Sequence, residues 1–200
     1  MLQSLARLLV VSLCFAASAA FAANPQVELD TTAGKIRIEL YPDAAPKTVQ
    51  NFLDYVKAGH YNGTQFHRVI AGFMIQGGGY TEDYQQKPTR APVPIESQQS
   101  VKAGLSNVPG TVSMARTGDP NSATAQFFIN VANNKRLDFR SADPAGYGYT
   151  VFGKVVDGMD VVNKVAKGPK GATGAVPPGI NPADVPSTQV VIKGAKVIGG

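Results

Sequence analysis

Apolar and charged residues alternate in residues 35–41 of the chain. Ile36, Ile38 and Leu40 occupy every second position, and the positions between them are charged. A period of two is typical of a β-strand with one buried and one solvent-exposed face. A shorter segment with apolar residues, 27–30, precedes it, and Thr-Thr-Ala-Gly at 31–34 separates the two. We therefore predict a β-hairpin at the start of the domain.

A period close to 3.6 follows in residues 45–58. Pro46 stands where the first turn of a helix tolerates proline, and Gly59 comes directly after the last turn. Four apolar residues between them have the spacing i, i+3, i+4 and i+7, namely Val49, Phe52, Leu53 and Val56. We predict an amphipathic helix over 45–58 whose apolar face packs on the core.

The rest of the chain alternates short apolar segments with turns that contain glycine and proline. It predicts strands at 69–70, 73–75, 110–115, 126–131, 149–156 and 188–198, a second helix at 159–167, a polar loop at 81–106 and a flexible loop at 168–179. Many short strands with two helices indicate a mainly β domain, either a sandwich or a barrel. A closed barrel is favoured because closure removes unpaired strand edges.

The first 22 residues have the features of a secretory signal peptide. Arg7 is followed by a nearly continuous apolar segment at 8–17, and Ala20-Phe21-Ala22 has the small-x-small pattern of a cleavage site, with small residues third and first before the cleaved bond. We predict cleavage after Ala22, which leaves a mature domain at 23–200 with no membrane segment. The only cysteine, Cys14, is removed with the leader, so core packing without disulfides must stabilise the exported domain.

The charge balance is mildly basic. The chain has 19 basic and 14 acidic residues, a formal net charge of +5, which becomes +4 when Arg7 is removed with the leader. Only Lys164, Lys167 and Lys170 form a local basic group, so we expect no nucleic-acid binding. The absence of a heptad repeat and of a long apolar run in the mature sequence predicts a monomer.

Several kinds of active site find no support in the sequence. His60 and His67 are seven residues apart, with no cysteine or acidic cluster beside them, so no zinc spacing is present. A Gly-x-Ser-x-Gly turn, typical of serine hydrolases, does not occur, nor does the phosphate-binding loop of nucleotide enzymes. We predict no metal and no cofactor.

Arg68 stands at the head of a segment that is otherwise typical of buried strand. A buried guanidinium is too costly to leave unpaired, so it must reach solvent, meet a carboxylate or line a cleft. Amide and apolar side chains that could form such a cleft stand nearby in the sequence or in a later strand: Gln76, Gln126, Phe66, Phe73, Met74 and Phe128. The alternative is that these residues are ordinary core and turn residues and that Arg68 pairs with an acid. Composition and periodicity leave both interpretations open.

Four segments, in this order, resemble the motifs of the cyclophilin family of peptidyl-prolyl cis-trans isomerases. They are FHRVIAGFMIQGG at 66–78, GTVSMART at 110–117, SATAQFFIN at 122–130 and VFGKVVDGM at 151–159. Together with the leader, the pattern looks most like the periplasmic cyclophilins of Gram-negative bacteria. The resemblance implies a mainly β fold, a closed eight-stranded antiparallel β-barrel capped by two α-helices.

The resemblance also implies roles for individual residues. It assigns Arg68 as the catalytic residue and eleven residues as substrate-binding: His67, Phe73, Met74, Gln76, Ala115, Arg116, Thr117, Gln126, Phe128, Leu137 and Tyr149. At three positions the sequence departs from common members of the family. Arg116 stands in place of an asparagine, Tyr149 in place of a histidine, and Arg136 in place of the tryptophan of cyclosporin-sensitive members. We therefore expect weak or no cyclosporin binding.

The implied function is acceleration of rotation about X-Pro bonds in exported, incompletely folded polypeptides of the periplasm, without a cofactor. Two other functions stay open on the residues alone. The groove could hold proline-containing segments without isomerising them, as a peptide-binding protein does. A hydrolase built on His67 and a serine is the third possibility.

Overall fold

The computed structural model describes residues 23–172, 176 and 179–199. The predicted leader at 1–22 lies outside the described residues, as do positions 173–175 and 177–178 of the predicted loop at 168–179. None of the helices in the described ranges is long and apolar enough to cross a membrane.

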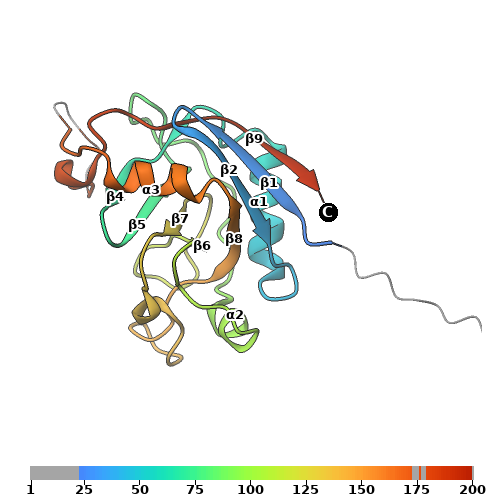
Figure 1. Ribbon diagram of the computed structural model, residues 1–200. Helices are drawn as coiled ribbons and strands as arrows, with labels where there is room; N and C mark the ends of the chain where they lie inside the picture. The colour runs from blue at the N-terminus through green and yellow to red at the C-terminus, as the bar shows by residue number, and fades with distance from the viewer. Residues whose placement is uncertain (1–22, 173–175, 177–178, 200) are drawn as a thin grey trace, which may run out of the picture.

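Nine strands form one antiparallel sheet that curves around an apolar core (Figure 1). The strands are β1 (Gln26–Thr31), β2 (Gly34–Leu40), β3 (Thr64–Gln65), β4 (Arg68–Ile70), β5 (Met74–Gly77), β6 (Thr111–Met114), β7 (Phe127–Asn130), β8 (Val151–Asp157) and β9 (Val191–Gly199). Their order in the sheet is β3-β9-β1-β2-β8-β6-β7-β5-β4. The predicted hairpin is confirmed as β1 and β2, and the predicted bend between strands is confirmed between β4 and β5.

The prediction of a closed eight-stranded barrel is wrong, because the sheet has nine strands within the described ranges and its outermost strands, β3 and β4, do not pair with each other. The edge strands β3 and β4 are two and three residues long, and only Phe66 and His67 separate them along the chain. The N–H of Phe66 donates to the carbonyl of Val190 at 2.9 Å, so the backbone at this crossing is paired outside β4. The sheet is therefore a half-barrel whose edges are joined by the chain but by no hydrogen-bonded ladder.

Three α-helices accompany the sheet, one more than predicted. They are α1 (Pro46–Lys57), α2 (Ser97–Lys102) and α3 (Met159–Lys167), and two short 3₁₀ helices are η1 (Lys135–Leu137) and η2 (Pro182–Asp184). The predicted helices α1 and α3 are confirmed. Helix α2 lies in the segment expected to be a loop, and its buried residues are Ser97 and Ser100. Because polar side chains are what α2 buries, apolar periodicity gives no signal for it.

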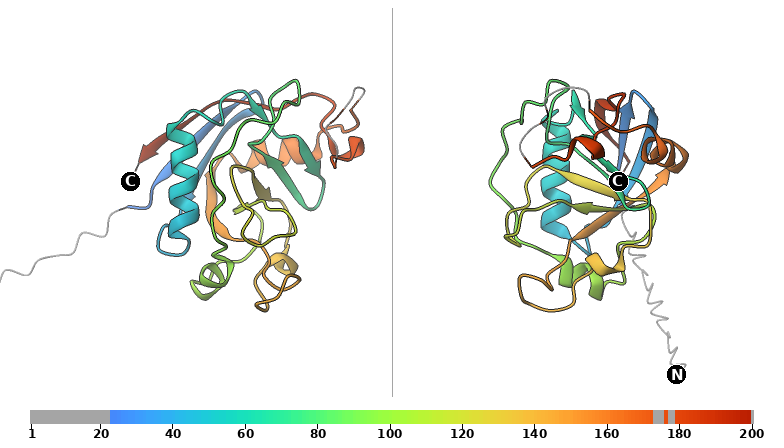
Figure 2. Two further views of the ribbon diagram at one scale, coloured as in Figure 1. Left: turned by 180° about the vertical axis from the view of Figure 1, so that it is seen from behind. Right: turned by 90° about the vertical axis from the view of Figure 1, so that its left-hand side faces the viewer.

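Helices α1 and α3 pack onto the same apolar core as the sheet (Figure 2). Phe52 of α1 and Val162 of α3 are both fully buried in this cluster. The N-terminus of α1 has no cap from its own flanking residue. Instead Glu96 accepts hydrogen bonds from the backbone N–H groups of Lys47 and Thr48, at 3.1 and 2.8 Å. A carboxylate at this end satisfies unpaired N–H groups and complements the helix dipole.

Candidate active site

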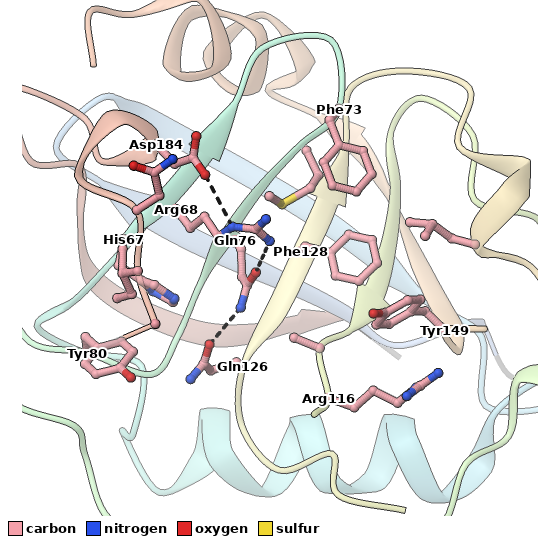
Figure 3. A pocket seen from close by; sticks show the side chains of 16 residues that line it. His67, Arg68, Phe73, Gln76, Tyr80, Arg116, Gln126, Phe128, Tyr149 and Asp184 are labelled. Atoms are coloured by element: carbon pink, nitrogen blue, oxygen red, sulfur yellow. Dashed lines mark hydrogen bonds and ion pairs between the residues drawn. The ribbon is translucent and has the colours of Figure 1, made fainter. Parts of the chain in front are cut away.

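One groove brings together most of the residues that the sequence singles out. It has a cavity volume of about 380 Å³ and lies beside β4, β5 and β7 (Figure 3). Eleven of the twelve predicted site residues line it: His67, Arg68, Phe73, Met74, Gln76, Ala115, Arg116, Gln126, Phe128, Leu137 and Tyr149. The exception is Thr117, whose exposed side chain contacts the hydroxyl of Ser122 at 2.7 Å. The shared location is observed, whereas the catalytic and binding roles stay predictions.

Arg68 lies in this groove and also has a carboxylate partner. Its Nε is 3.7 Å from Oδ2 of Asp184, and its Nη1 donates to Oε1 of Gln76 at 3.4 Å (Figure 3). The side chain is 38% exposed. Arg68 therefore lines a cleft with the amide and apolar side chains named above, and of the alternative interpretation only the pairing with an acid applies.

Two glutamine side chains extend the polar side of the groove. The Nε2 of Gln76 donates to Oε1 of Gln126 at 2.9 Å, which continues the line that starts at Arg68. A Cβ at Gly79 would lie 2.6 Å from the Gln126 side chain, so glycine is needed there for the close approach. The last of the three consecutive glycines thus serves the site directly.

The opposite side of the groove is apolar. Met74 and Phe128 are almost fully buried, and Phe73 and Leu137 are partly exposed beside them. The rings of Phe128 and Tyr149 meet edge to face, with their centres 5.6 Å apart. Together these residues form a pocket of the kind that accepts a small apolar ring.

A buried amide network holds this apolar pocket from behind. The Nδ2 of Asn134 donates to the carbonyl of Phe73 at 2.8 Å and to Oδ1 of Asn130 at 2.7 Å. Asn130 in turn donates to Oδ1 of Asn107 at 3.2 Å, and Asn107 donates through its backbone N–H to Asp138 at 2.7 Å. The network links Phe73, in the turn between β4 and β5, to the segment around η1 that carries Leu137. Because an unpaired buried amide is costly, the two walls are fixed relative to each other.

His67 is buried at the floor of the groove, with only 2% of its surface exposed. The rings of His67 and Tyr80 meet edge to face, with their centres 4.8 Å apart. The Nδ1 of His67 has no hydrogen-bond partner within the described residues. Burial lowers the pKa of His67 from 6.5 to about 4, because the charged imidazolium is disfavoured away from water. The imidazole is therefore neutral at pH 7.

Five lining residues were missed by the sequence analysis: Tyr80, Gly179, Ile180, Asn181 and Asp184. Asp184 is the most informative of them. Asp184 belongs to η2. On its N-terminal side, Oδ1 of Asn181 accepts a hydrogen bond from the N–H of Ala183 at 3.1 Å, and on its C-terminal side Val185 is fully buried. The chain is thus anchored on both sides of Asp184. The sequence offered an acidic partner for Arg68 as one of three possibilities, but nothing in it indicated which of the 14 acidic residues that partner would be.

Comparison with known proteins identifies the family. A family model described as cyclophilin type peptidyl-prolyl cis-trans isomerase/CLD matches residues 26–197. The chain belongs to the cyclophilin family. This cyclophilin is a peptidyl-prolyl cis-trans isomerase, so the predicted enzyme class is confirmed and the hydrolase interpretation finds no support.

The relatives of this cyclophilin include several bacterial isomerases. It is 54% identical to a peptidyl-prolyl cis-trans isomerase of Streptomyces antibioticus over 86% of this chain and 98% of the relative. Isomerase A of Dickeya dadantii is 49% identical over 97% of this chain and 96% of the relative. Isomerase B of Escherichia coli is 48% identical over 86% of this chain and 98% of the relative. Among solved structures, this chain is similar to a Cryptosporidium parvum cyclophilin crystallised in the presence of the dipeptide Ala-Pro. The TM-score is 0.66 and the sequence identity is 26%, and the match covers 88% of this chain and 99% of the other chain.

The buried neutral state of His67 predicts a pH-dependent stability. The unfolded chain protonates this histidine near pH 6.5 and the folded domain only near pH 4, so protons stabilise the unfolded state between these values. Between pH 7 and pH 4.5 we expect the free energy of unfolding to fall by about 2 to 3 kcal/mol more in the wild type than in His67→Gln. Urea denaturation at both pH values measures this difference.

A control is available in the second histidine, His60, which is partly exposed. His60→Gln should keep most of the wild-type pH dependence. Equal pH dependence in the wild type and in His67→Gln would contradict the prediction.

Proposed function

We propose that this cyclophilin isomerises X-Pro bonds in exported polypeptides and so assists their folding in the periplasm. The observation that carries the proposal is the groove itself, in which the guanidinium of Arg68 shares one cavity with the apolar side chains of Phe73, Met74, Phe128 and Leu137. The leader-like sequence at 1–22 supports export. The mature chain acts as a monomer on proline-containing segments, with no nucleic-acid or membrane partner.

The reaction has a barrier that a hydrogen-bond donor can lower. Rotation about an X-Pro amide costs about 18–20 kcal/mol because it breaks the resonance between nitrogen and carbonyl. At the perpendicular geometry the proline nitrogen becomes pyramidal and regains a lone pair. A donor aimed at this lone pair binds the rotated state better than the planar one, which is differential stabilisation of the transition state.

The groove supplies the parts that this mechanism needs. The apolar pocket holds the proline ring while the acyl side of the bond rotates. Arg68 donates to the proline nitrogen, and its Nη2 makes no hydrogen bond within the described ranges. Gln76 contacts Nη1 of the guanidinium at 3.4 Å, and Asp184 lies 3.7 Å from its Nε. Lowering the barrier by roughly 6 kcal/mol would raise a rate of about 0.01 per second to hundreds per second.

The planar donor group of Arg68 is expected to be essential. Arg68→Ala and Arg68→Lys should both lower kcat/KM by about 100-fold or more, because a compact ammonium lacks the planar fork and loses a preorganised donor. The measurement is the cis-to-trans rate of an Ala-Pro peptide at low temperature, with protein beginning at Ala23.

Arg37→Lys on β2 is the matched control, since Arg37 contacts Asp157 and does not line the groove. Its activity should equal that of the wild type. Near wild-type turnover in Arg68→Lys would exclude the proposed role. Capture of unfolded polypeptides that survives in Arg68→Ala would separate holding from isomerisation.

Asp184 is proposed as a positioning residue that acts through Arg68. Asp184→Ala should lower kcat by about two- to fivefold with a smaller change in KM, because a partly exposed ion pair contributes up to about 1 kcal/mol. Asp184→Asn keeps an acceptor oxygen and should retain more activity. The melting temperature reports any structural effect, and Asp157→Asn on β8 is the control. An unchanged kcat in Asp184→Ala would contradict this role.

Weak binding of cyclosporin is also part of the proposal. Arg136 stands where the resemblance has a tryptophan in sensitive cyclophilins, and its guanidinium lies over the ring of Phe73, 4.8 Å from the ring centre. The indole ring and its N–H donor are absent, so an apolar macrocycle would meet a hydrated charge there. Isothermal calorimetry should give a dissociation constant well above the micromolar level, and a submicromolar value would contradict the prediction.

A further inference from the structure

The charged groups around the groove are not balanced. Asp184 pairs with Arg68, so these two charges offset each other. Arg116 and Arg136, on the apolar side, have no carboxylate within 4.0 Å among the described residues. Arg116 lines the groove, and Arg136 lies next to it, over the ring of the lining residue Phe73, so no ion pair offsets the charge of either guanidinium.

Acidic side chains on the adjoining loops bind backbone N–H groups. Asp119 accepts from the N–H of Asn121 at 2.8 Å, and Asp143 accepts from the N–H groups of Ala145 and Gly146 at 3.0 Å. Asp138, the neighbour of Leu137, accepts from the N–H of Asn107 at 2.7 Å. These carboxylates stabilise turns and the buried amide network instead of pairing with the two arginines.

Arg116 is held in place although it has no acidic partner. Its Nε donates to the carbonyl of Gly148 at 2.9 Å, and its Nη1 donates to the carbonyl of Thr117 at 2.8 Å. The guanidinium lies 4.7 Å from the centre of the Tyr149 ring, which lines the same groove (Figure 3). No hydrogen bond from its Nη2 occurs in the part of the chain that the structure describes. This nitrogen is the donor that remains for a ligand.

Arg136 offers more donors. It is exposed on η1, lies over the ring of Phe73, and makes no hydrogen bond or ion pair within the described ranges. Its backbone is fixed by the flanking residues, because the N–H of Leu137 donates to Asn134 at 2.8 Å and Asp138 belongs to the buried network. Stacking on an aromatic ring leaves the edge of a guanidinium directed outward, and this edge matches a carboxylate in a bidentate geometry.

We infer that Arg116 and Arg136, each over a different ring of the pocket, provide a carboxylate subsite that selects substrates with an acidic side chain next to the proline. The inference rests on the proposed function, because the subsite requires a proline in the pocket beside Phe73 and Tyr149. A glutamate or aspartate flanking the proline would meet unoffset positive charge, whereas a lysine would be repelled. Since the attraction is electrostatic and partly exposed, it weakens with added salt.

The test is a set of X-Pro peptides of equal length that differ at one position. Glu, Gln and Lys are placed directly before the proline in one series and directly after it in a second series. In wild-type protein at low ionic strength we expect kcat/KM for the Glu peptide to exceed that for the Gln peptide about fivefold in at least one series, with the Lys peptide below both. The ratio of kcat/KM for the Glu peptide to that for the Gln peptide should fall toward one in about 0.5 M salt, because exposed charges are then screened within a few ångströms.

Variants identify the residues responsible, because the Glu/Gln ratio is read within each protein and does not depend on its overall activity. Arg136→Gln should bring the ratio close to one, and Arg116→Gln should lower it. Lys135→Gln is the matched control, since Lys135 is the exposed neighbour of Arg136 and, within the described residues, its ammonium lies over no aromatic ring. It should keep the wild-type ratio.

The outcomes separate the two levels of the argument. Equal rates for Glu and Gln peptides in both series, with normal turnover, would overturn the subsite and leave the proposed function intact. A preference that persists unchanged in Arg116→Gln and Arg136→Gln would also overturn it. No turnover of any peptide would overturn the proposed function and the subsite together.

Discussion

The register between four neighbouring strands is the constraint on which the rest of this structure depends. Val69, Ile75, Ile129 and Val112 stand opposite one another across β4, β5, β7 and β6, and each is fully buried in the core. The adjacent row consists of Arg68, Gln76, Phe128 and Ser113. Because side chains alternate between the two faces of a sheet, burial of the first row turns the second row away from the core. A slip by one residue would exchange the two rows, so the packing that stabilises the core also fixes the groove.

The groove has support of a different chemical kind on each side. The apolar walls are joined by the buried amides of Asn107, Asn130 and Asn134, whose hydrogen bonds would be lost if the walls separated. On the polar side, Gln76 and Asp184 contact the guanidinium of Arg68 from β5 and η2. A pocket for a proline ring and a donor for its nitrogen must keep a constant separation. The rigidity of both sides meets that requirement.

Local pattern was sufficient for some elements and insufficient for others. The hairpin and α1 were predictable because apolar periodicity and turn residues agree there, and the motif at 66–78 led to the groove through resemblance. Helix α2 was missed because the residues that it buries are serines. The closed barrel was wrong because closure would need backbone hydrogen bonds between β3 and β4, and no side-chain pattern in the sequence reports whether these form. Asp184 lies 116 residues from Arg68 in the numbering, on a turn of the segment between α3 and β9. Only the folded chain shows that they meet.

The distribution of charge in the groove is consistent with what catalysis of this rotation requires. An enzyme gains rate only from interactions that are stronger in the transition state than in the bound substrate. If the charge of Arg68 had no partner, a substrate carboxylate could capture it in the ground state and withdraw the donor from the proline nitrogen. Asp184 offsets that charge without occupying Nη2. In the proposed arrangement, recognition of an acidic substrate is left to Arg116 and Arg136, which lie over the rings of Tyr149 and Phe73 and not beside the donor. If binding and rotation use separate guanidinium groups in this way, a charged substrate does not slow its own isomerisation.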